Sequence, residues 1–370
     1  MVAEGRAVAY AELYAALGPV GEGPLAVPAR GTHDFARSLW SAWRAGVPFV
    51  PLDPSLDAAP PLGELPPDTR TVVFTSGTSG RPKPVALTAQ NHEASALASA
   101  WSLGVAPDDR WLCCLPLWHV GGLAVLHRSA VYGTTAVLHD GFDAARVRDS
   151  IESGEATVVS LVATMLRRLV GAGLDRWPAL RAALVGGGPV PRDLVEWAAE
   201  AGFPLRPTYG MTETASQVAT DGRPLPGVEL RIAGDGEILV RGPMVAPGAP
   251  AADGWLHTRD RGRLDDDGVL HVEGRIDDTI VTGGENVAAA EVEEALLSHP
   301  AVADAAVAGR PDPEWGEAVT AFVVAGEAVS DGELAAHCRE RLAPFKVPKA
   351  IVRVDELPRN AAGKVLRARL

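Results

Sequence analysis

The sequence has 370 residues, of which 47% are hydrophobic and 22% are charged, and its formal net charge at pH 7 is −13. This length allows two or three domains with sizeable cores, and the composition is that of a globular protein, not of a disordered or fibrous one. The 47 acidic side chains outnumber the 34 basic ones, which argues against nucleic acid or an anionic membrane as the main partner, because phosphate groups require basic surfaces.

The cysteines and the N-terminal segment indicate where the protein works. Cys113, Cys114 and Cys338 are too few and too unevenly spaced for a disulfide framework or a zinc site, so we predict a reducing compartment. Residues 1–30 lack a basic start followed by an apolar run, and no uninterrupted apolar stretch of about 18 residues occurs. We therefore expect a cytoplasmic protein without membrane insertion.

The N-terminal part of the chain predicts helical pieces and then strands. The helical pieces cover Tyr10–Leu17 and Thr32–Arg44, and a short strand covers Pro48–Leu52 before a Pro-rich connector. After the connector, Thr71–Phe74 is β-branched and aromatic and predicts a buried strand. The chain after this strand is the most informative stretch of the sequence.

The segment Phe74–Lys83, read FTSGTSGRPK, concentrates hydroxyls, glycines and a cation. Hydroxyls can donate to phosphoryl oxygens, and glycines let backbone N–H groups approach an anion without a Cβ in the way. The lysine adds a positive charge at the end. We predict a phosphate-binding loop made of Thr75, Ser76, Gly77, Thr78, Ser79, Gly80 and Lys83.

Other readings of this segment fit less well. A solvated linker rarely follows a buried strand or ends in Arg-Pro-Lys-Pro. The spacing G-x-x-x-x-G-K-[ST] would need glycine at Pro82 and a hydroxyl at Pro84, and no G-x-G-x-x-G opens a helix here. The segment therefore indicates a nucleotide loop of another kind.

A histidine follows the next strand. Thr88–Leu103 predicts an Ala-rich helix with Thr88 as N-cap and Gly104 as its stop. Trp111–Leu117 predicts a buried strand, and a second helix runs to about Tyr132. His119 lies at this strand-to-helix junction, where α/β sheets place ligands, although a structural role for a lone histidine remains the alternative.

Strands and helices then alternate. Strands are expected over Thr135–Leu138, Thr157–Leu161 and Leu180–Val185, and helices over Ala144–Glu152 and Ala163–Gly171. This rhythm predicts a mostly parallel sheet covered on both faces.

Two strand ends in this region carry candidate nucleotide contacts. Glycines 186–188 follow one strand and could let an adenine ring lie against the backbone, with a plain tight turn as the alternative. The strand Leu205–Thr208 leads into Tyr209-Gly210-Met211-Thr212-Glu213-Thr214. Thr212 can bond a phosphoryl oxygen, and Glu213 can hold the Mg²⁺ that a nucleoside triphosphate needs.

Short strands and turns dominate from about residue 225 to residue 274 and predict a small β subdomain that contains Asp260. A compact α+β unit follows, with a helix over Ala290–Ser298, strands over Val302–Ala308 and Ala318–Val324, and a helix over Asp331–Leu342. The chain then ends in a polar tail that contains Gly363 and Lys364.

These motifs, in this order, resemble those of the ATP-dependent, AMP-forming adenylating enzymes, which include acyl-CoA synthetases, adenylation domains and luciferases. The resemblance extends from about Val47 to the end of the chain. It rests on the Ser/Thr/Gly loop, the "P-x-x-H-x-x-G" segment at His119, the "Y-G-x-T-E" hexad, Asp260 in Thr258-Arg259-Asp260, and Gly363-Lys364. Arg259 replaces the usual glycine of "T-G-D", and the N-terminal region is shortened.

The family resemblance implies roles for individual residues in acyl-adenylate formation. Tyr209 would stack on adenine, Asp260 would accept both ribose hydroxyls, and Arg275 would be a second ribose contact. Asp277 would be the hinge residue. Lys364 would hold the carboxylate and the α-phosphate, and a mobile cation suits a step that builds negative charge. On the residues alone, Lys364 would instead be a solvated lysine near the chain end, and Asp260 a surface aspartate.

The resemblance also implies a second step, in which a C-terminal rotation replaces Lys364 with the loop at Gly283 and Gly284 and admits the thiol of coenzyme A. Trp315, Lys346 and Lys349 are candidates to lie near coenzyme A, and ordinary surface positions are the alternative. The cofactors are therefore ATP, Mg²⁺ and coenzyme A.

Within this family, Leu115–Leu123 and the residues after it look most like the o-succinylbenzoate:CoA ligases of menaquinone biosynthesis. Such an acid carries a second carboxylate, and burying that anion demands a cation. Arg128 is the matching residue, with a helix-surface arginine as the alternative. His119 and Gly210 would complete the acid site.

Three rival functions remain. A peptide-synthetase adenylation domain would carry an aspartate near His119, and no acid lies between Trp111 and His127. A CoA ligase for a fatty or aryl acid would have no second carboxylate for Arg128 to pair with, so Arg128 discriminates between the two functions. A non-catalytic nucleotide-binding module would not need Lys364, Glu213 and Asp260 together.

The predicted fold is α/β. A large N-terminal domain, residues 1–274, holds doubly covered, mostly parallel sheets and the β subdomain. A small mobile α+β C-terminal domain, residues 275–370, carries the catalytic lysine. Because the N-terminal region is shortened, a homodimer is a further possible prediction for this chain.

Overall fold

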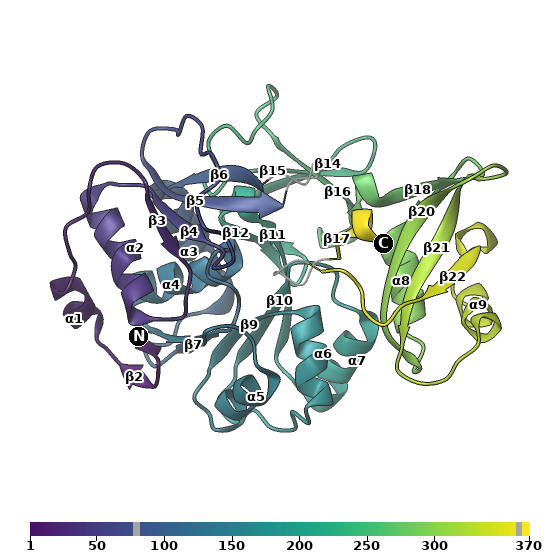
Figure 1. Cartoon of the computed structure of the whole chain (residues 1–370), viewed down its shortest axis with the longest axis horizontal. Helices are drawn as coiled ribbons and strands as arrows, with labels where there is room; N and C mark the ends of the chain where they lie inside the picture. The colour runs from purple at the N-terminus through teal and green to yellow at the C-terminus, as the bar shows by residue number, and fades with distance from the viewer. Residues whose placement is uncertain (77–81, 360–364) are drawn as a thin grey trace. The chain divides into compact units, whose positions relative to one another are not determined.

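The computed structural model describes residues 1–76, 82–359 and 365–370 (Figure 1). These residues form two compact units, and each is described by itself. The first unit holds Met1–Gly187, Ala201–Leu230 and Val240–Leu256, and the second holds Gly188–Glu200, Arg231–Leu239 and His257–Leu370. The domain boundary predicted at residues 274 and 275 stays a prediction.

The largest described sheet lies in the first unit, in the strand order β13-β12-β11-β10-β9-β7-β8-β1-β2. Strands β10, β9, β7 and β8 pair in parallel and are almost fully buried, as strands covered on both faces should be, while β11 pairs in parallel with β10 and is half-buried. The strands are β1 (Val2–Ala3), β2 (Arg6–Ala7), β7 (Arg110–Cys113), β8 (Thr135–Leu138), β9 (Val158–Val162), β10 (Ala182–Gly186), β11 (Leu205–Met211), β12 (Ser216–Thr220) and β13 (Arg223–Pro224).

The helices between these strands match the predicted alternation. They are α3 (Ala89–Leu103), α4 (Val120–Tyr132), α5 (Ala144–Glu152) and α6 (Ala163–Gly171). Thr88 caps α3 as predicted, because its hydroxyl accepts from the Asn91 N–H while the Asn91 side chain accepts from the Thr88 N–H. The mostly parallel, helix-covered sheet predicted from the sequence is confirmed.

A second sheet of the first unit runs β3-β4-β5-β6, with β3 (Leu25–Pro28), β4 (Phe49–Leu52), β5 (Thr69–Ser76) and β6 (Pro82–Thr88). It is accompanied by α1 (Tyr10–Ala15) and α2 (His33–Ala45). Strand β6 was not predicted, because Pro82 and Pro84 look like strand breakers. The sheet tolerates them, since β6 lies at its edge, where proline leaves few ladder bonds unmade.

The predicted β subdomain is a sheet in the order β14-β15-β16-β17. Its strands are β14 (Glu229–Ile232), β15 (Glu237–Arg241), β16 (Leu256–Leu264) and β17 (Leu270–Arg275). Helix α7 (Arg192–Ala201) lies mostly in the second unit.

The C-terminal part of the second unit is a sheet in the order β19-β18-β21-β20, with β22 pairing with β21. Figure 1 shows β20 and β21 as its long strands, with α8 beside them. Its elements are β18 (Thr279–Thr282), β19 (Glu285–Ala288), α8 (Ala289–Leu297), β20 (Val302–Asp312), β21 (Gly316–Ala325), α9 (Asp331–Arg339) and β22 (Ala350–Arg353). A core of Val292, Leu296, Val307, Val319 and Leu334 holds the helices on the sheet.

Two further observations concern the cysteine thiols and the helices. The thiols of Cys113, Cys114 and Cys338 are free and buried. Burial raises the pKa of the Cys113 thiol to about 12 and that of the Cys338 thiol to about 11. Among the helices of the described ranges, none is long and apolar enough to cross a membrane.

Candidate active site

The first unit gathers several predicted site residues at one edge of its main sheet. Strands β7, β9, β10 and β11 run parallel, so the chain leaves all of them at the same edge. His119 follows β7, Gly186 ends β10, and Tyr209 and Gly210 lie in the last part of β11. The edge where α/β sheets bind ligands therefore carries the residues predicted for adenine and acid binding.

His119 begins α4 as its N-cap and is largely buried. Burial lowers the pKa of His119, against the opposite influence of the Asp53 carboxylate, so the ring is neutral at pH 7. Its Nε2 is buried without a hydrogen-bond partner among the described residues. An unpaired polar atom at such a position is a candidate to contact a bound acid.

Glycines 186 and 187 have structural reasons of their own. A Cβ at Gly186 would lie 2.4 Å from Thr208 Oγ1, so β10 and β11 could not pack as they do. Gly187 has a φ of +79°, a backbone conformation that favours glycine. Strand packing thus requires glycine at Gly186 and a turn favours it at Gly187, while the contact of these glycines with adenine stays a prediction. Gly188, which lies in the second unit, has open space at its Cβ in the described structure.

The hexad spans the end of β11 and the turn that follows it, and this turn is strained. A Cβ at Gly210 would lie only 1.8 Å from the Ser216 carbonyl oxygen, so β11 and β12 can approach this closely only with glycine there. Ala215 and Ser216 have φ values of +49° and +99°, which are costly for residues with side chains and are typical of functional sites. The buried hydroxyl of Thr214 steadies this turn by accepting from the Met211 N–H at 3.2 Å.

Thr212 and Glu213 sit on this turn as η1 (Thr212–Thr214). The Glu213 backbone is fixed, because its carbonyl oxygen accepts from the Ala246 N–H at 2.7 Å. In the part of the chain that the structure describes, no residue bonds to the Glu213 carboxylate, and no three His, Cys, Asp or Glu side chains gather into a metal site. This suits Mg²⁺, which one carboxylate can hold while phosphate oxygens and waters complete the shell.

The predicted phosphate loop is described only at its two ends. Thr75 and Lys83 face each other across the antiparallel pair β5 and β6, and Thr75 Oγ1 donates to the Lys83 carbonyl oxygen at 3.4 Å. The strand pair thus brings two predicted phosphate ligands together next to the segment that connects β5 and β6. Gly77, Thr78, Ser79 and Gly80 lie outside the described residues, and so does the side chain of Ser76.

Arg128 is buried in the first unit, with 3% of its surface exposed, so the helix-surface alternative is wrong. Its Nη1 donates to Gln217 Oε1, and its Nη2 donates to Ser95 Oγ at 3.0 Å. Its Nε has no partner, and no carboxylate pairs with it, among the residues of the described ranges. Burial lowers the pKa of this guanidinium, which still holds its charge at neutral pH. A buried cation without a counter-ion is costly, and a nearby anion would stabilise it.

Sequence reasoning missed two buried histidines beside Arg128. The rings of His92 and His127 lie 4.3 Å apart, and His92 Nε2 is 2.6 Å from Thr71 Oγ1. Burial lowers the pKa of His92 to about 3, and the charge of Arg128 acts in the same direction. Both histidines are therefore neutral. Their contact depends on the packing of α3, α4 and β5, which the sequence alone does not reveal.

In the second unit, the two predicted ribose contacts lie side by side. Asp260 and Arg275 are partners across β16 and β17, and Arg275 Nη1 lies 3.3 Å from Asp260 Oδ1. The Asp260 N–H donates to Thr258 Oγ1 at 3.1 Å, which fixes its backbone. The two side chains therefore lie within reach of one another, and their contact with a ribose stays a prediction.

The predicted hinge residue, Asp277, is paired with arginines of the same unit. Arg259 Nη2 donates to Asp277 Oδ1 at 2.6 Å, and Arg275 Nη2 lies 3.9 Å from Asp277 Oδ2. Arg259 has a φ of +61°, which explains why glycine is usual at this position of the motif. In this chain an arginine takes the left-handed conformation, and its side chain reaches the hinge carboxylate.

The residues predicted to lie near coenzyme A make two separate sets of contacts in the second unit. Gly283 and Gly284 form the turn between β18 and β19, and a Cβ at Gly283 would lie 2.9 Å from Trp315 Cε3. Lys349 Nζ lies 4.3 Å from the centre of the Trp315 ring. Lys346 lies apart from this group, because its ammonium donates to both oxygens of Glu291, at 2.7 and 2.6 Å. Lys364 lies outside the described residues.

Two family models and several known proteins match this chain. The model described as "AMP-binding enzyme" matches residues 59–248, and the "AMP-binding enzyme C-terminal domain" matches residues 291–364. A 2-succinylbenzoate–CoA ligase of Bacillus velezensis is 46% identical over an alignment of 333 residues that covers 82% of this chain and 68% of that protein.

Two solved structures of the o-succinylbenzoate coenzyme A synthetase of Bacillus subtilis are similar over 100% of this chain, each with a TM-score of 0.89 and 35% identity. One holds the acyl-adenylate intermediate and is covered to 94%, and the other holds ATP and a magnesium ion and is covered to 95%. The predicted resemblance is confirmed: this chain belongs to the AMP-binding enzyme family.

Proposed function

We propose that this protein is an AMP-forming acid–CoA ligase that activates 2-succinylbenzoate (o-succinylbenzoate) with ATP and transfers the acyl group to coenzyme A, as menaquinone biosynthesis requires. The observation that carries the proposal is the likeness, over the whole chain, to a synthetase bound to its acyl-adenylate. The carboxylate of Glu213, on the turn after β11, has no bonding partner among the described residues, which agrees with the Mg²⁺·ATP that this reaction needs.

In the first step, a carboxylate oxygen of the acid attacks the α-phosphorus of ATP. A new P–O bond forms, the bond to the β-phosphate oxygen breaks, and pyrophosphate leaves with Mg²⁺. We assign Glu213 to the metal, Thr212 and the loop Thr75–Lys83 to phosphoryl oxygens, and Asp260 with Arg275 to the ribose. Lys364 stabilises the charge that develops between the carboxylate and the α-phosphate.

In the second step, the thiol of coenzyme A releases its proton to solvent and its sulfur attacks the acyl carbonyl carbon, so that a C–S bond forms and AMP leaves with the electrons of the C–O bond. We assign Asp277 to the hinge that removes Lys364 before this step. Gly283, Trp315 and Lys349 form the pantetheine-side surface, because they lie together. Lys346, paired with Glu291, has less free charge to offer to a coenzyme A phosphate.

Arg128 distinguishes this acid from others by charge. Its Nη groups already bond Gln217 and Ser95, so we assign it to electrostatic stabilisation of the second carboxylate, at a buried site where such interactions are strong. Replacing Arg128 with Met should raise the KM for 2-succinylbenzoate at least tenfold more than the KM for benzoate. An equal rise for both acids would assign Arg128 to the core alone.

The test of the proposed function is ATP- and CoA-dependent AMP release with 2-succinylbenzoate, benzoate, phenylacetate and a medium-chain fatty acid. We expect a strong preference for 2-succinylbenzoate. Activity with another acid only would keep the ligase chemistry and discard the menaquinone assignment. No activity with any acid would favour the nucleotide-binding module.

We also propose that the enzyme works in the cytoplasm, since its free, buried thiols suit a reducing compartment. Its partners are then the small molecules ATP, acid and coenzyme A. The homodimer stays a prediction that light scattering on the purified protein would test.

A further inference from the structure

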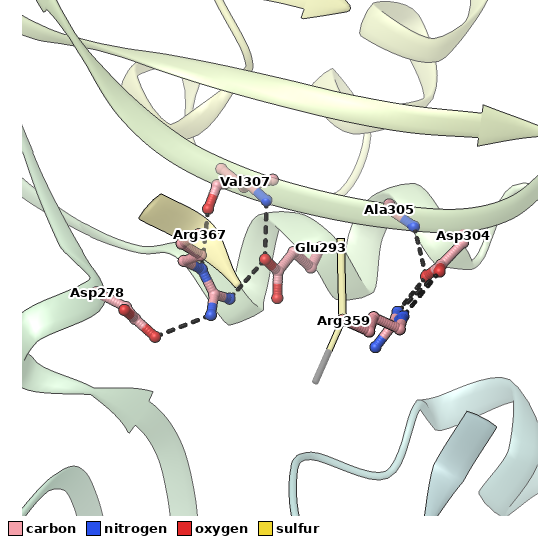
Figure 2. A network of polar contacts seen from close by, with 7 residues as sticks. All are labelled: Asp278, Glu293, Asp304, Ala305, Val307, Arg359 and Arg367. Atoms are coloured by element: carbon pink, nitrogen blue, oxygen red, sulfur yellow. Dashed lines mark hydrogen bonds and ion pairs between the residues drawn. The ribbon is translucent and has the colours of Figure 1, made fainter. Parts of the chain in front are cut away.

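The chain on either side of residues 360–364 is fastened to the body of the second unit by ion pairs. These residues include Lys364 and fall between two arginines, Arg359 and Arg367. Figure 2 shows that the two arginines reach different carboxylates of the same unit.

Arg359 anchors the chain before the segment. Its Nη2 donates to both carboxylate oxygens of Asp304, at 2.7 and 2.8 Å, and its Nε lies 3.3 Å from Asp304 Oδ2. Asp304 is itself fixed, because its Oδ1 accepts from the Ala305 N–H at 3.0 Å on β20. This fork-shaped pairing fixes direction as well as distance.

Arg367 anchors the chain after the segment with three contacts (Figure 2). Its Nη2 donates to Glu293 Oε1 at 2.6 Å, its Nη1 donates to Asp278 Oδ2 at 2.9 Å, and its Nε donates to the Val307 carbonyl oxygen at 3.2 Å. Glu293 also accepts from the Val307 N–H at 2.8 Å. Arg367 thus joins α8, β20 and the residue that follows Asp277.

The two anchors act at neighbouring points. Arg359 and Val365 form an isolated antiparallel bridge, and the Leu366 N–H donates to the Pro358 carbonyl oxygen at 2.7 Å. Arg359 and Val365, the described residues that flank the segment, therefore lie beside each other. Val365 and Leu370 also pack on the cluster of Ala306, Phe322 and Leu357.

The environment of Glu293 makes the second anchor costly to disturb. Burial raises the pKa of Glu293, and the charge of Arg367 opposes that rise. Without Arg367, Glu293 would be a buried carboxylate with no cation, which is strongly unfavourable.

We propose that Arg359 and Arg367 are positioning residues for acyl-adenylate formation: they fix both ends of the segment that carries Lys364, and Arg367 ties that segment to Asp278 beside the hinge residue. The proposal rests on the role given to Lys364 under the proposed function. We assign neither arginine a direct contact with substrate. Their effect follows from geometry, because a displacement of about 1 Å of a charge-stabilising group can cost about 100-fold in rate.

The test separates the two half-reactions. Arg367→Ala should lower the rate of acyl-adenylate formation, read as pyrophosphate release, by about tenfold or more. The rate of thioester formation from pre-made acyl-adenylate and coenzyme A, which does not use Lys364, should change by less than about twofold. Arg367→Lys should recover part of the loss, since it keeps the charge but not the fork.

A matched control lies in the same unit. Arg353, eleven residues before Lys364, donates to Asp331 Oδ1 from Nη2 at 2.6 Å and from Nε at 3.0 Å. Arg353→Ala should leave both half-reactions unchanged. Should Arg367→Ala fail to fold, Asp278→Asn removes only one contact of the second anchor and should show the same imbalance at smaller size.

A readout without activity completes the design. The lysines of the chain are Lys83, Lys346, Lys349 and Lys364, and Lys83 precedes a proline. A lysine-specific protease should cut after Lys364 faster in Arg367→Ala than in the wild type or in Arg353→Ala. Unchanged cutting together with unchanged adenylate formation would overturn the proposal, and so would an equal loss of both half-reactions.

A failure of this positioning proposal can be told apart from a failure of the proposed function. The half-reactions are compared with whichever acid the wild type accepts, so a wrong acid assignment does not affect the comparison. The protease readout needs no substrate at all.

Discussion

The turn after β11 and the tail around Lys364 serve the same proposed reaction but are built in different ways. The turn is a backbone structure: Gly210 allows the close approach of two strands, and Ala215 and Ser216 take left-handed conformations. The tail is held by side chains, through the pairs of Arg359 with Asp304 and of Arg367 with Glu293 and Asp278.

This difference determines how each region responds to change. A turn defined by sterics has one shape, which neither salt nor pH alters, and it fails abruptly when a Cβ is added. A tail held by partly exposed ion pairs weakens gradually and responds to salt. In the proposed reaction the cation must later leave the active site, and the second kind of construction suits that.

The largest effect should come from Lys364→Ala, which removes the tail's reactive group. We expect acyl-adenylate formation to fall on the order of 100- to 1,000-fold, as when one charge-stabilising group is lost. Thioester formation from pre-made acyl-adenylate should remain. Equal loss of both steps would contradict the assignment of separate conformations to the two steps.

Gly210→Ala tests the steric turn and should be next in size. The added Cβ would overlap the Ser216 carbonyl oxygen, so the strands must separate, at a cost of about 3 kcal/mol in the free energy of unfolding. Gly133→Ala is the control, because Gly133 has a φ of +70° but open space at its Cβ, and it should cost only about 1 kcal/mol. Urea denaturation of both variants measures the difference, and similar values would mean that the turn can relax.

The buried histidines give the first unit a pH dependence that the turn lacks. The folded-state pKa of His92, about 3, lies below its ordinary value of 6.5, so the unfolded chain binds the proton more readily. Stability should therefore be complete above pH 6.5 and fall as the pH drops toward 3. At pH 5.5 the loss from this group is about 1.4 kcal/mol, and His92→Gln should flatten the decline. A melting temperature that does not change between pH 7 and pH 5.5 would contradict this account.

Arg259 has both a left-handed backbone and an ion pair, and its replacement by glycine (Arg259→Gly) should change stability the least. Glycine relieves the left-handed backbone, while the ion pair with Asp277 is lost. We expect the melting temperature to change by no more than about 2 °C, since these effects oppose each other. The rate of the thioester step should rise by about threefold if the pair holds back the hinge. A slower thioester step would instead assign the pair to that step.

Regions defined by local chemistry could be predicted from the sequence. The helix Ala144–Glu152 and the strand Thr135–Leu138 were predicted with their observed bounds, because apolar spacing and flanking polar residues mark them clearly. The hexad could be recognised because its glycine and hydroxyls are adjacent in the chain. Asp260 and Arg275 were identified only through the family resemblance, and the structure then placed them side by side.

What remained hidden depends on contacts between distant residues. Strand β6 needed an edge position to accommodate its prolines. The burial of Arg128 depends on Ser95 and Gln217, which lie on other elements. The partners of Arg367 lie between residues 278 and 307, and a sequence does not reveal which carboxylate an arginine will meet.

The three cysteine thiols, described above as free and buried, have a practical consequence. Burial raises their pKa values well above neutrality, so maleimide dyes should leave them unmodified in the folded protein. Reporter cysteines can therefore be introduced at exposed positions without first removing the native ones. The exchange between the two half-reactions could then be followed by fluorescence energy transfer, one molecule at a time, in an otherwise unaltered chain.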